Sequence, residues 1–316
     1  MCLYPRLIKN KKYTRNQKNG GIIPPVNDSR VLYVPIGCGE CIECKKQKKN
    51  EWQTRLMDDI KINKNAKFIT LTFSNEKYTE LNKEINQNAK PYEIDNQLAT
   101  LATRRFLERW RKEYKRSLRH WLVTELGQQN TENIHLHGLI WTEKEEKIIN
   151  KIWKYGYTFI GQYVNEITIN YIVKYINKID ALHKTYRSII LTSPGIGNNY
   201  INTTNSTKNK YKEKQTQETY ITKTGTKISL PVYWRNKIYT DEEREKLWIE
   251  KLNKKQRYVL GQKIDISKDQ KQYVAALKIA QAKNIRLGYG TGKKNWIKQH
   301  YEEQRRKILQ EERKMK

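Results

Sequence analysis

Residues 133–141, NIHLHGLIW, place two histidines one residue apart in a segment that reads as a β-strand. Side chains alternate between the two faces of a strand, so His135 and His137 point the same way. Paired imidazoles on a stiff backbone form a bidentate metal site, whereas the plainer alternative is two polar residues on a solvated face. The chain contains only five histidines, and finding two of them in this pattern favours a functional site.

The charge of the chain points to an anionic partner. Its 63 Lys and Arg against 33 Asp and Glu give a net charge of +30 over 316 residues. Such an excess strains a compact fold unless nucleic acid or an acidic membrane neutralises it; a surface kept soluble by lysine is the alternative. The 21 Tyr and 8 Trp are interleaved with the cations. Rings beside cations are typical of proteins that bind single-stranded nucleic acid.

Nothing in the sequence indicates a membrane partner. No stretch approaches the roughly 18–20 apolar residues that span a bilayer. The first residues, MCLYPR, contain no apolar signal region. We therefore expect a cytoplasmic protein whose thiols stay reduced. The length suits one sizeable core with extensions, or two modest domains.

Hydrophobic periodicity predicts alternating helices and strands before residue 200. A polar turn joins strand 121–126 to the histidine strand, so we expect these two strands to form a hairpin. In chain order the expected elements are a helix with Trp52, Leu56 and Ile60 on one face, strand 68–73, helix 101–116, strand 121–126, the histidine strand, strand 157–161 and helix 170–179.

The chain beyond residue 200 is more polar. Residues 202–219 are expected to form a flexible linker or a long loop. Two helix starts are predicted from capping boxes, one at Thr240 with Glu243 and one at Ser267 with Gln270. Residues 296–316 are densely charged and suggest a solvated helix or tail.

A helix over residues 171–179, YIVKYINKI, presents a second candidate group. At 100° per residue its tyrosines and lysines lie within about 100° of arc, opposite an apolar side. A phenol is a poor nucleophile, but it can attack a phosphodiester when a divalent cation polarises the phosphate and nearby cations absorb charge. Packing tyrosines are the alternative. The residues concerned are Tyr171, Lys174, Tyr175 and Lys178.

Two imidazoles alone would hold a metal weakly, so a third ligand is expected. Glu125 lies near the end of the strand that pairs with the histidine strand, and a short hairpin would bring it alongside. One carboxylate with His135 and His137 suits Mg²⁺ or Mn²⁺ and leaves positions open for a phosphate oxygen and water. An ordinary charge at a strand end is the alternative for Glu125.

Four cysteines, Cys2, Cys38, Cys41 and Cys44, match the number that closes a tetrahedral zinc site. Structural Zn²⁺ would fix the N-terminal segment to the following helix; free cysteines at a helix start are the alternative. The basic run at residues 45–49 (KKQKK) is expected either to lie near DNA or to form a solvated helix face. The candidate DNA-binding cations are Lys45, Lys46, Lys48, Lys49, Arg104, Arg105 and Lys178.

The order of these motifs resembles that of the HUH endonucleases. Residues 135–137 (HLH) resemble their histidine motif, 171–175 (YIVKY) their two-tyrosine motif, and 68–73 (FITLTF) their first strand motif. The resemblance narrows to the rolling-circle replication initiators of the Microviridae, especially the gokushovirus-like group, on further matches in the same order. These are Cys2, 38–44 (CGECIEC), 194–197 (PGIG) and 230–233 (LPVY); Thr124 replaces the family's usual glycine before the glutamate.

This resemblance implies an α+β fold with an HUH endonuclease-like central antiparallel sheet of about five strands and flanking helices. An N-terminal cysteine module with a helix (1–62), a nuclease core (63–200) and a polar linker with a basic, largely helical region (201–316) are expected. It implies metal-dependent nicking and rejoining of single-stranded origin DNA by Tyr171 or Tyr175 through a 5′-phosphotyrosine, with a host DNA polymerase and helicase as partners in a bacterial cytoplasm. A plasmid initiator, relaxase or transposase would share this chemistry, whereas a non-catalytic, zinc-stapled single-strand-binding protein would not.

Overall fold

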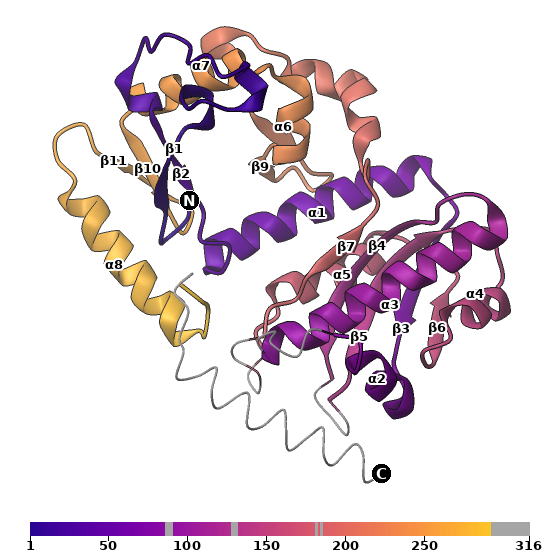
Figure 1. Cartoon of the computed structure of the whole chain (residues 1–316). Coiled ribbons are helices and arrows are strands. Elements are labelled where there is room, and N and C mark those ends of the chain that lie inside the picture. Colours follow the sequence, from indigo (N-terminus) through magenta and orange to yellow (C-terminus); the bar gives the residue numbers. More distant parts are fainter. Residues whose placement is uncertain (86–90, 128–131, 181–182, 184–185, 292–316) are drawn as a thin grey trace. The chain divides into compact units, whose positions relative to one another are not determined.

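The computed structural model describes residues 1–85, 91–127, 132–180, 183 and 186–291. The chain divides into two compact units (Figure 1). The first unit combines Met1–Glu51 with Asn199–Lys293, and the second contains Trp52–Asn198. The expected charged segment at 296–316 lies outside the described residues. Within the described part, no helix is both long and apolar enough to cross a membrane.

The unit over Trp52–Asn198 is built on a five-stranded antiparallel sheet, as the α+β prediction required. Its order is β6-β3-β5-β4-β7, so the histidine strand β5 occupies the centre. The predicted hairpin of β4 with β5 is confirmed. The strands are β3 (Ala66–Leu71), β4 (Arg119–Leu126), β5 (Ile134–Trp141), β6 (Thr158–Gly161) and β7 (Ile190–Thr192).

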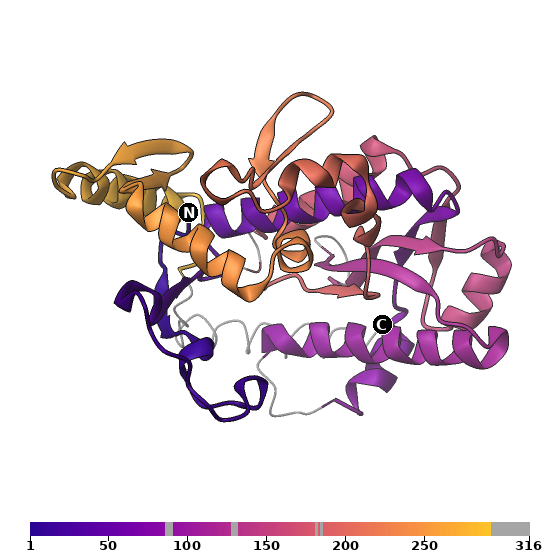
Figure 2. The ribbon, with the colours of Figure 1, turned by 90° about the horizontal axis from the view of Figure 1, so that it is seen from above.

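Helices pack on both faces of this sheet, as the views in Figures 1 and 2 also show. Alternation along β5 sends Leu136 and Ile140 into the core beneath α3 (Pro91–Tyr114). Leu139 and Trp141 enter the opposite core with α5 (Glu166–Asn177) and the later part of α1 (Ile42–Ile62). The predicted apolar face of Trp52, Leu56 and Ile60 lies in this second core. Shorter helices α2 (Asn75–Asn82) and α4 (Glu146–Trp153) complete the unit.

Helix α5 begins four residues before the expected start at 170 because Asn165 caps it. The Asn165 side chain accepts hydrogen bonds from the backbone N–H groups of Ile167 and Thr168, and Thr168 completes a capping box. Ile172, Val173 and Ile176 are buried against the sheet. The helix is therefore fixed at its start and along one side, which orients its tyrosines.

The unit of Met1–Glu51 with Asn199–Lys293 is built from small hairpins and helices. The capping box predicted at Thr240 and Glu243 is confirmed at the start of α7. The one predicted at Ser267 is wrong, because α8 begins at Lys271 and the Ser267 N–H is bound by Asp265. The elements are β1 (Arg6–Lys9), β2 (Tyr33–Ile36), β8 (Thr219–Ile221), β9 (Lys227–Ser229), α6 (Val232–Ile238), α7 (Asp241–Asn253), β10 (Gln256–Val259), β11 (Gln262–Asp265) and α8 (Lys271–Arg286).

Residues 202–219, expected as a linker or long loop, form short 3-10 turns held by a buried asparagine. Asn209 is 2% exposed. Its side chain accepts a hydrogen bond from the Tyr200 hydroxyl at 2.7 Å and donates to the carbonyls of Gln217 and Thr219. Asn209 therefore ties this largely exposed segment together, because its buried amide bonds to groups on both sides of it in the chain.

Candidate active site and cysteine cluster

The sheet register gathers the histidines and Glu125 on one face. Glu125 lies opposite His135 in the β4–β5 hairpin, and His137 lies opposite Val123 on one side and Thr70 on the other. Because side chains alternate along each strand, Glu125, His135 and His137 project from the same face. The structure thus places the three side chains predicted as metal ligands on one face, with Glu125 and His137 in contact and the His135 ring 6.3 Å from that of His137.

Glu125 is the electrostatic centre of this face. One carboxylate oxygen lies 3.0 Å from His137 Nε2, and the other is paired with the Lys178 ammonium. Burial raises the pKa of Glu125, but the hydrogen bonds from His137 and Lys178 outweigh it, so the net pKa is lowered. The carboxylate is therefore ionised at neutral pH and carries the negative charge that a cation requires.

His137 is held from two further sides. Thr70 Oγ1 lies 3.1 Å from His137 Nδ1, and the Tyr175 ring stacks on the imidazole at 4.6 Å with an interplanar angle of 5°. A contact with Nδ1 leaves Nε2 directed toward Glu125. The imidazole is consequently fixed by a strand on one side and by α5 on the other.

His135 occupies the more confined position beside the hairpin turn. Burial, together with the neighbouring His137, lowers the pKa of His135 from its usual value, so the imidazole is neutral and its lone pair is free for coordination. A Cβ at Gly127 would lie 3.0 Å from His135 Cε1 and 3.1 Å from the Asn133 carbonyl. Glycine at 127 therefore leaves the space that the ring fills.

The two tyrosines of α5 differ in exposure. Tyr175 is 6% exposed and donates a 2.7 Å hydrogen bond to the hydroxyl of Tyr171, which is 42% exposed. Burial and this donated bond, with the charge of Glu125, raise the pKa of Tyr175. Lys174 Nζ lies 3.8 Å from the centre of the Tyr171 ring. Tyr171 is thus the phenol that solvent reaches, and it carries a hydrogen-bond donor and a cation beside it.

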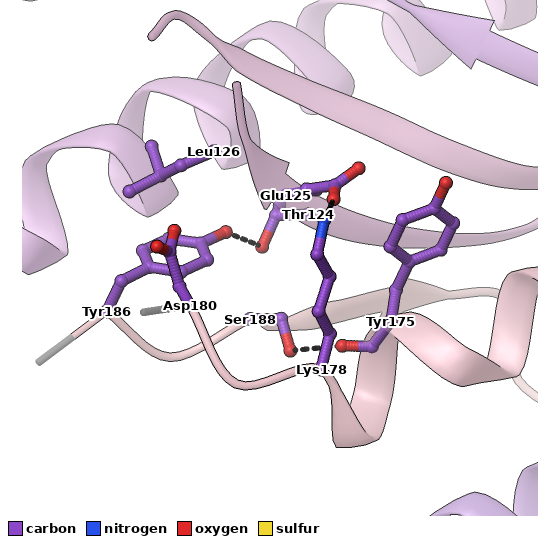
Figure 3. A pocket seen from close by; sticks show the side chains of 8 residues that line it. All are labelled: Thr124, Glu125, Leu126, Tyr175, Lys178, Asp180, Tyr186 and Ser188. Carbon is purple, nitrogen blue, oxygen red and sulfur yellow. Dashed lines mark hydrogen bonds and ion pairs between the residues drawn. The ribbon is translucent and has the colours of Figure 1, made fainter. Parts of the chain in front are cut away.

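A small pocket opens beside Glu125 (Figure 3). Lys178 crosses it to reach Glu125, with Tyr175 on one side and Tyr186 and Asp180 on the other. Lys178, predicted as a DNA-binding cation, is therefore engaged by the carboxylate in this structure. Its ammonium occupies one of the positions where a bound cation would meet Glu125.

Thr124, the departure from the family pattern, is accommodated on the opposite side of β4. Its hydroxyl donates to Asn96 Oδ1 at 2.8 Å and accepts from the Tyr186 hydroxyl and the Ile189 N–H. Thr124 is fully buried, and every one of these contacts lies away from the histidine face. The substitution leaves Glu125 in register with His135.

Two contacts that support the candidate active site were not predicted from the sequence. Thr70 orients His137, and the buried His183 lies between two carboxylates, at 2.7 Å from Asp180 and 2.9 Å from Glu132. Both ring nitrogens of His183 face carboxylate oxygens. This bridge ties the segment after α5 to the start of β5. Only the alternation in 68–73 (FITLTF) hinted at Thr70, and no local signal marked His183.

The four cysteines form a closed cluster in the other unit. Their Sγ atoms all lie within 4.8 Å of one another, and two of the separations are 3.9 and 4.0 Å. Four sulfurs around zinc at about 2.3 Å are separated by about 3.8 Å in a tetrahedron. Among the described residues, this is the one group of potential ligands gathered closely enough to hold an ion as it stands. The cysteine cluster, Cys2, Cys38, Cys41 and Cys44, therefore fits a structural zinc ion.

The surroundings of the cysteine cluster suit thiolates. Backbone N–H groups of Leu3, Tyr4, Cys38 and Cys41 donate to its sulfurs at 3.2–3.5 Å. A hydrogen bond from Cys44 lowers the pKa of Cys41 to about 4, while burial raises the pKa of Cys38 to about 11. Crowded thiols thus resist losing every proton unless a cation compensates their charge.

Of the remaining predicted cations, the two arginines lie apart from the histidine face. Arg105 is paired with Glu84 through two hydrogen bonds, and Arg104 lies near Glu108. Both arginines belong to α3, which covers the opposite face of the sheet. The structure therefore does not bring them to the tyrosines. Lys45, Lys46, Lys48 and Lys49 lie in the first part of α1, in the unit of the cysteine cluster.

Comparison with known proteins finds one family. Residues 66–180 match the family model described as replication-associated protein ORF2. The matched stretch runs from the start of β3 to just beyond α5, so it includes the histidines, Glu125 and both tyrosines. This similarity is consistent with a microvirus-like replication initiator. No curated protein and no solved structure matches the chain significantly.

Proposed function

We propose that this chain, similar over residues 66–180 to replication-associated proteins, nicks and rejoins single-stranded origin DNA to start rolling-circle replication. The observation that supports this most is the contact of a two-tyrosine helix with a metal-ligand face. The Tyr175 ring stacks on His137, and the Tyr171 hydroxyl is bonded to that of Tyr175. A nucleophile and a cation site on adjacent elements supply the two requirements of phosphodiester transfer.

Glu125, His135 and His137 are the residues that would hold Mg²⁺ or Mn²⁺. One ionised carboxylate and two imidazoles on a single sheet face fit a divalent cation with several positions left open. The bound cation supplies Lewis-acid polarisation of the scissile phosphate. Lys178 must leave Glu125 for this to occur, and its ammonium then becomes available to a DNA phosphate.

Tyr171 is the better first nucleophile of the pair. It is the exposed phenol, and the hydrogen bond that Tyr175 donates to it stabilises charge on its oxygen. Lys174 lies beside the same ring and offsets the negative charge of the pentavalent transition state. The Tyr171 oxygen bonds to phosphorus, its proton passes to solvent, and the 3′-oxygen leaves with the bonding electrons and is protonated. A 5′-phosphotyrosine and a free 3′-hydroxyl result.

The free 3′-hydroxyl is a primer for a host DNA polymerase. Tyr175, one helical turn from Tyr171, then provides a second phenol for cleaving and rejoining the displaced strand. Strand separation falls to a host helicase in a bacterial cytoplasm. The net charge of +30 supports retention on DNA through all these steps.

Covalent trapping tests the proposal. The full chain is incubated with Mn²⁺ and a pool of single-stranded DNA of randomised sequence labelled at the 3′ end, and products are resolved on a denaturing protein gel. A labelled adduct is expected, since the 5′-phosphotyrosine retains the 3′ fragment. Sequencing the trapped DNA then gives the nick site.

Matched tyrosine variants identify the nucleophile. Tyr171→Phe should reduce adduct formation most, and the double variant with Tyr175→Phe should abolish it. Tyr258→Phe is the control, because Tyr258 is 45% exposed, close to the 42% of Tyr171, and lies in the other unit. Binding of DNA with no adduct under Mg²⁺ or Mn²⁺ would refute the enzyme and leave a non-catalytic single-strand-binding protein.

A further inference from the structure

The edge of the central sheet exposes large rings on the histidine face. β6 is the edge strand next to β3, and Phe159 in β6 is 49% exposed. Tyr157, two residues earlier, is 66% exposed. Its carbonyl accepts hydrogen bonds from the N–H and hydroxyl of Thr72, which continue the pairing beyond the strand. Their neighbours Thr158 and Ile160 are buried on the other face.

The register aligns these rings with the candidate active site. Phe159 pairs with Thr70, and Thr70 pairs with His137, so the three residues form one row across the sheet. Adjacent strands are about 4.8 Å apart, which places Phe159 roughly 10 Å from His137 between backbones. Tyr157 projects from the same face by strand alternation.

A continuous series of ring contacts connects the edge to the tyrosines. Phe68 lies 6.0 Å from Phe159 and 6.0 Å from Tyr171 between ring centres, in both cases edge-on. The Tyr171 ring contacts Tyr175 at 5.5 Å, and Tyr175 stacks on His137. Phe159 is thus the outer end of the aromatic packing that contacts Tyr171.

We propose that Tyr157 and Phe159 form a base-stacking platform for the single-stranded DNA whose phosphate reaches Tyr171. Exposed rings stack on any base, whatever the sequence, and cations alongside hold the backbone. Lys174 lies beside Tyr171, and the excess of basic over acidic residues matches a polyanion better than another copy of a basic chain. The choice of single-stranded DNA as the ligand rests on the proposed function. The test of the platform measures binding and does not depend on cleavage.

Equilibrium binding without added Mg²⁺ or Mn²⁺ tests the platform. The full chain is titrated into a fluorescent oligothymidylate and into an oligonucleotide of equal length with abasic sites. Tyr157→Ala and Phe159→Ala should each weaken oligothymidylate binding roughly tenfold. The salt dependence should stay unchanged, because no phosphate contact is removed. The double variant should bind both oligonucleotides equally weakly.

Two variants control for structure. Phe159→Leu keeps an apolar side chain but removes the ring, so it should weaken binding in a folded protein, whereas Phe159→Trp should restore it. Tyr258→Ala removes a ring of similar exposure from β10 and should bind like the wild type.

The inference is overturned if the double variant binds oligothymidylate within twofold of the wild type. It is also overturned if the double variant changes only the sedimentation of the protein, since the rings would then contact a second copy. A chain that stacks bases but never forms the covalent adduct would keep the platform and refute the proposed function. If the double variant still forms the adduct and binds DNA with unchanged affinity, the platform is refuted and the proposed function is kept.

Discussion

The histidine face and the cysteine cluster are two potential metal sites with opposite constructions. The four sulfurs already lie within 4.8 Å of one another, and three of them accept hydrogen bonds from the backbone. Of the three predicted ligands on the histidine face, Glu125 and His137 are in direct contact, while the rings of His135 and His137 are 6.3 Å apart, and Lys178 pairs with the carboxylate. One site is closed and built of soft sulfur ligands, and the other is open and combines two imidazoles with a hard carboxylate.

The difference shows how each site would use its ion. A cluster that fills every coordination position with protein sulfur can only hold structure together. A face with three protein ligands and a displaceable lysine would leave room for substrate, and it would bind its ion weakly enough to exchange. The contrast therefore separates the proposed structural metal site from the proposed catalytic one.

The largest expected effect comes from removing both imidazoles. His135→Gln with His137→Gln should lower adduct formation by at least about 10³-fold, because roughly 4 kcal/mol of transition-state stabilisation is lost. Zinc content, measured by atomic emission, should stay at one ion per chain. His120→Gln is the control for a histidine on the same sheet. Loss of zinc in the double variant would mean that the two sites are not independent.

Removing a cysteine should produce the converse result. Cys41→Ser should reduce zinc to well below one per chain and lower the stability of its unit by roughly 4 kcal/mol, the effect of an ion at a thousand times its Kd. Hydrogen exchange should accelerate in α8, which packs on the cysteine cluster, and stay unchanged in β5. Equal protection of α8 in the variant would count against a structural metal.

A smaller effect is expected from Lys178, whose ammonium competes with a cation for the Glu125 carboxylate. Lys178→Met should raise Mn²⁺ affinity about fivefold, since the partly exposed ion pair with Glu125 is worth about 1 kcal/mol. Electron paramagnetic resonance titration measures this directly. Lys174→Met is the matched control, because Lys174 lies over the Tyr171 ring, and it should leave the affinity unchanged. Unchanged or weaker Mn²⁺ binding in Lys178→Met would remove the competing role.

A pH effect distinguishes a structural histidine from the predicted ligands. Burial lowers the pKa of His120, against a smaller opposing effect of the Leu118 carbonyl, so the folded state resists a proton that the unfolded chain accepts. Stability is therefore complete above the usual histidine pKa and falls as pH drops below it, by at most about 1.4 kcal/mol per pH unit.

Urea unfolding at pH 7.5 and 5.5 measures this dependence. His120→Gln should reduce the difference between the two pH values, although part should remain because the pKa of His135 is lowered in the same direction. An identical pH difference in His120→Gln would show that His120 does not contribute to it.

Local patterns predicted the elements and the facing residues of the candidate site. The alternation in 133–141 and the polar turn before it predicted that Glu125 lies alongside the histidine strand, and the register of the structure places it opposite His135. Contacts across the sheet were beyond such patterns. Thr70 and His137 are 67 residues apart, and His183 and Glu132 are 51 apart, so neither pairing has a local periodicity. Lys178 was predicted to bind DNA because it is a cation in the sequence. Its pairing with Glu125 depends on the tertiary fold, so no local pattern could predict it.

The division of the chain imposes an order on its synthesis. Trp52–Asn198 is one uninterrupted run, so all five strands of its sheet are synthesised before the later segment is made. The cysteines emerge earlier still, yet the Leu3 carbonyl bonds to Gln281 and the Ile42 N–H to Asn284, partners made near the end of the described chain. Until α8 has been synthesised, it cannot cover the thiols. Early capture of zinc would protect them from oxidation and hold a nascent N-terminal segment ready for a helix translated 278 residues after Leu3.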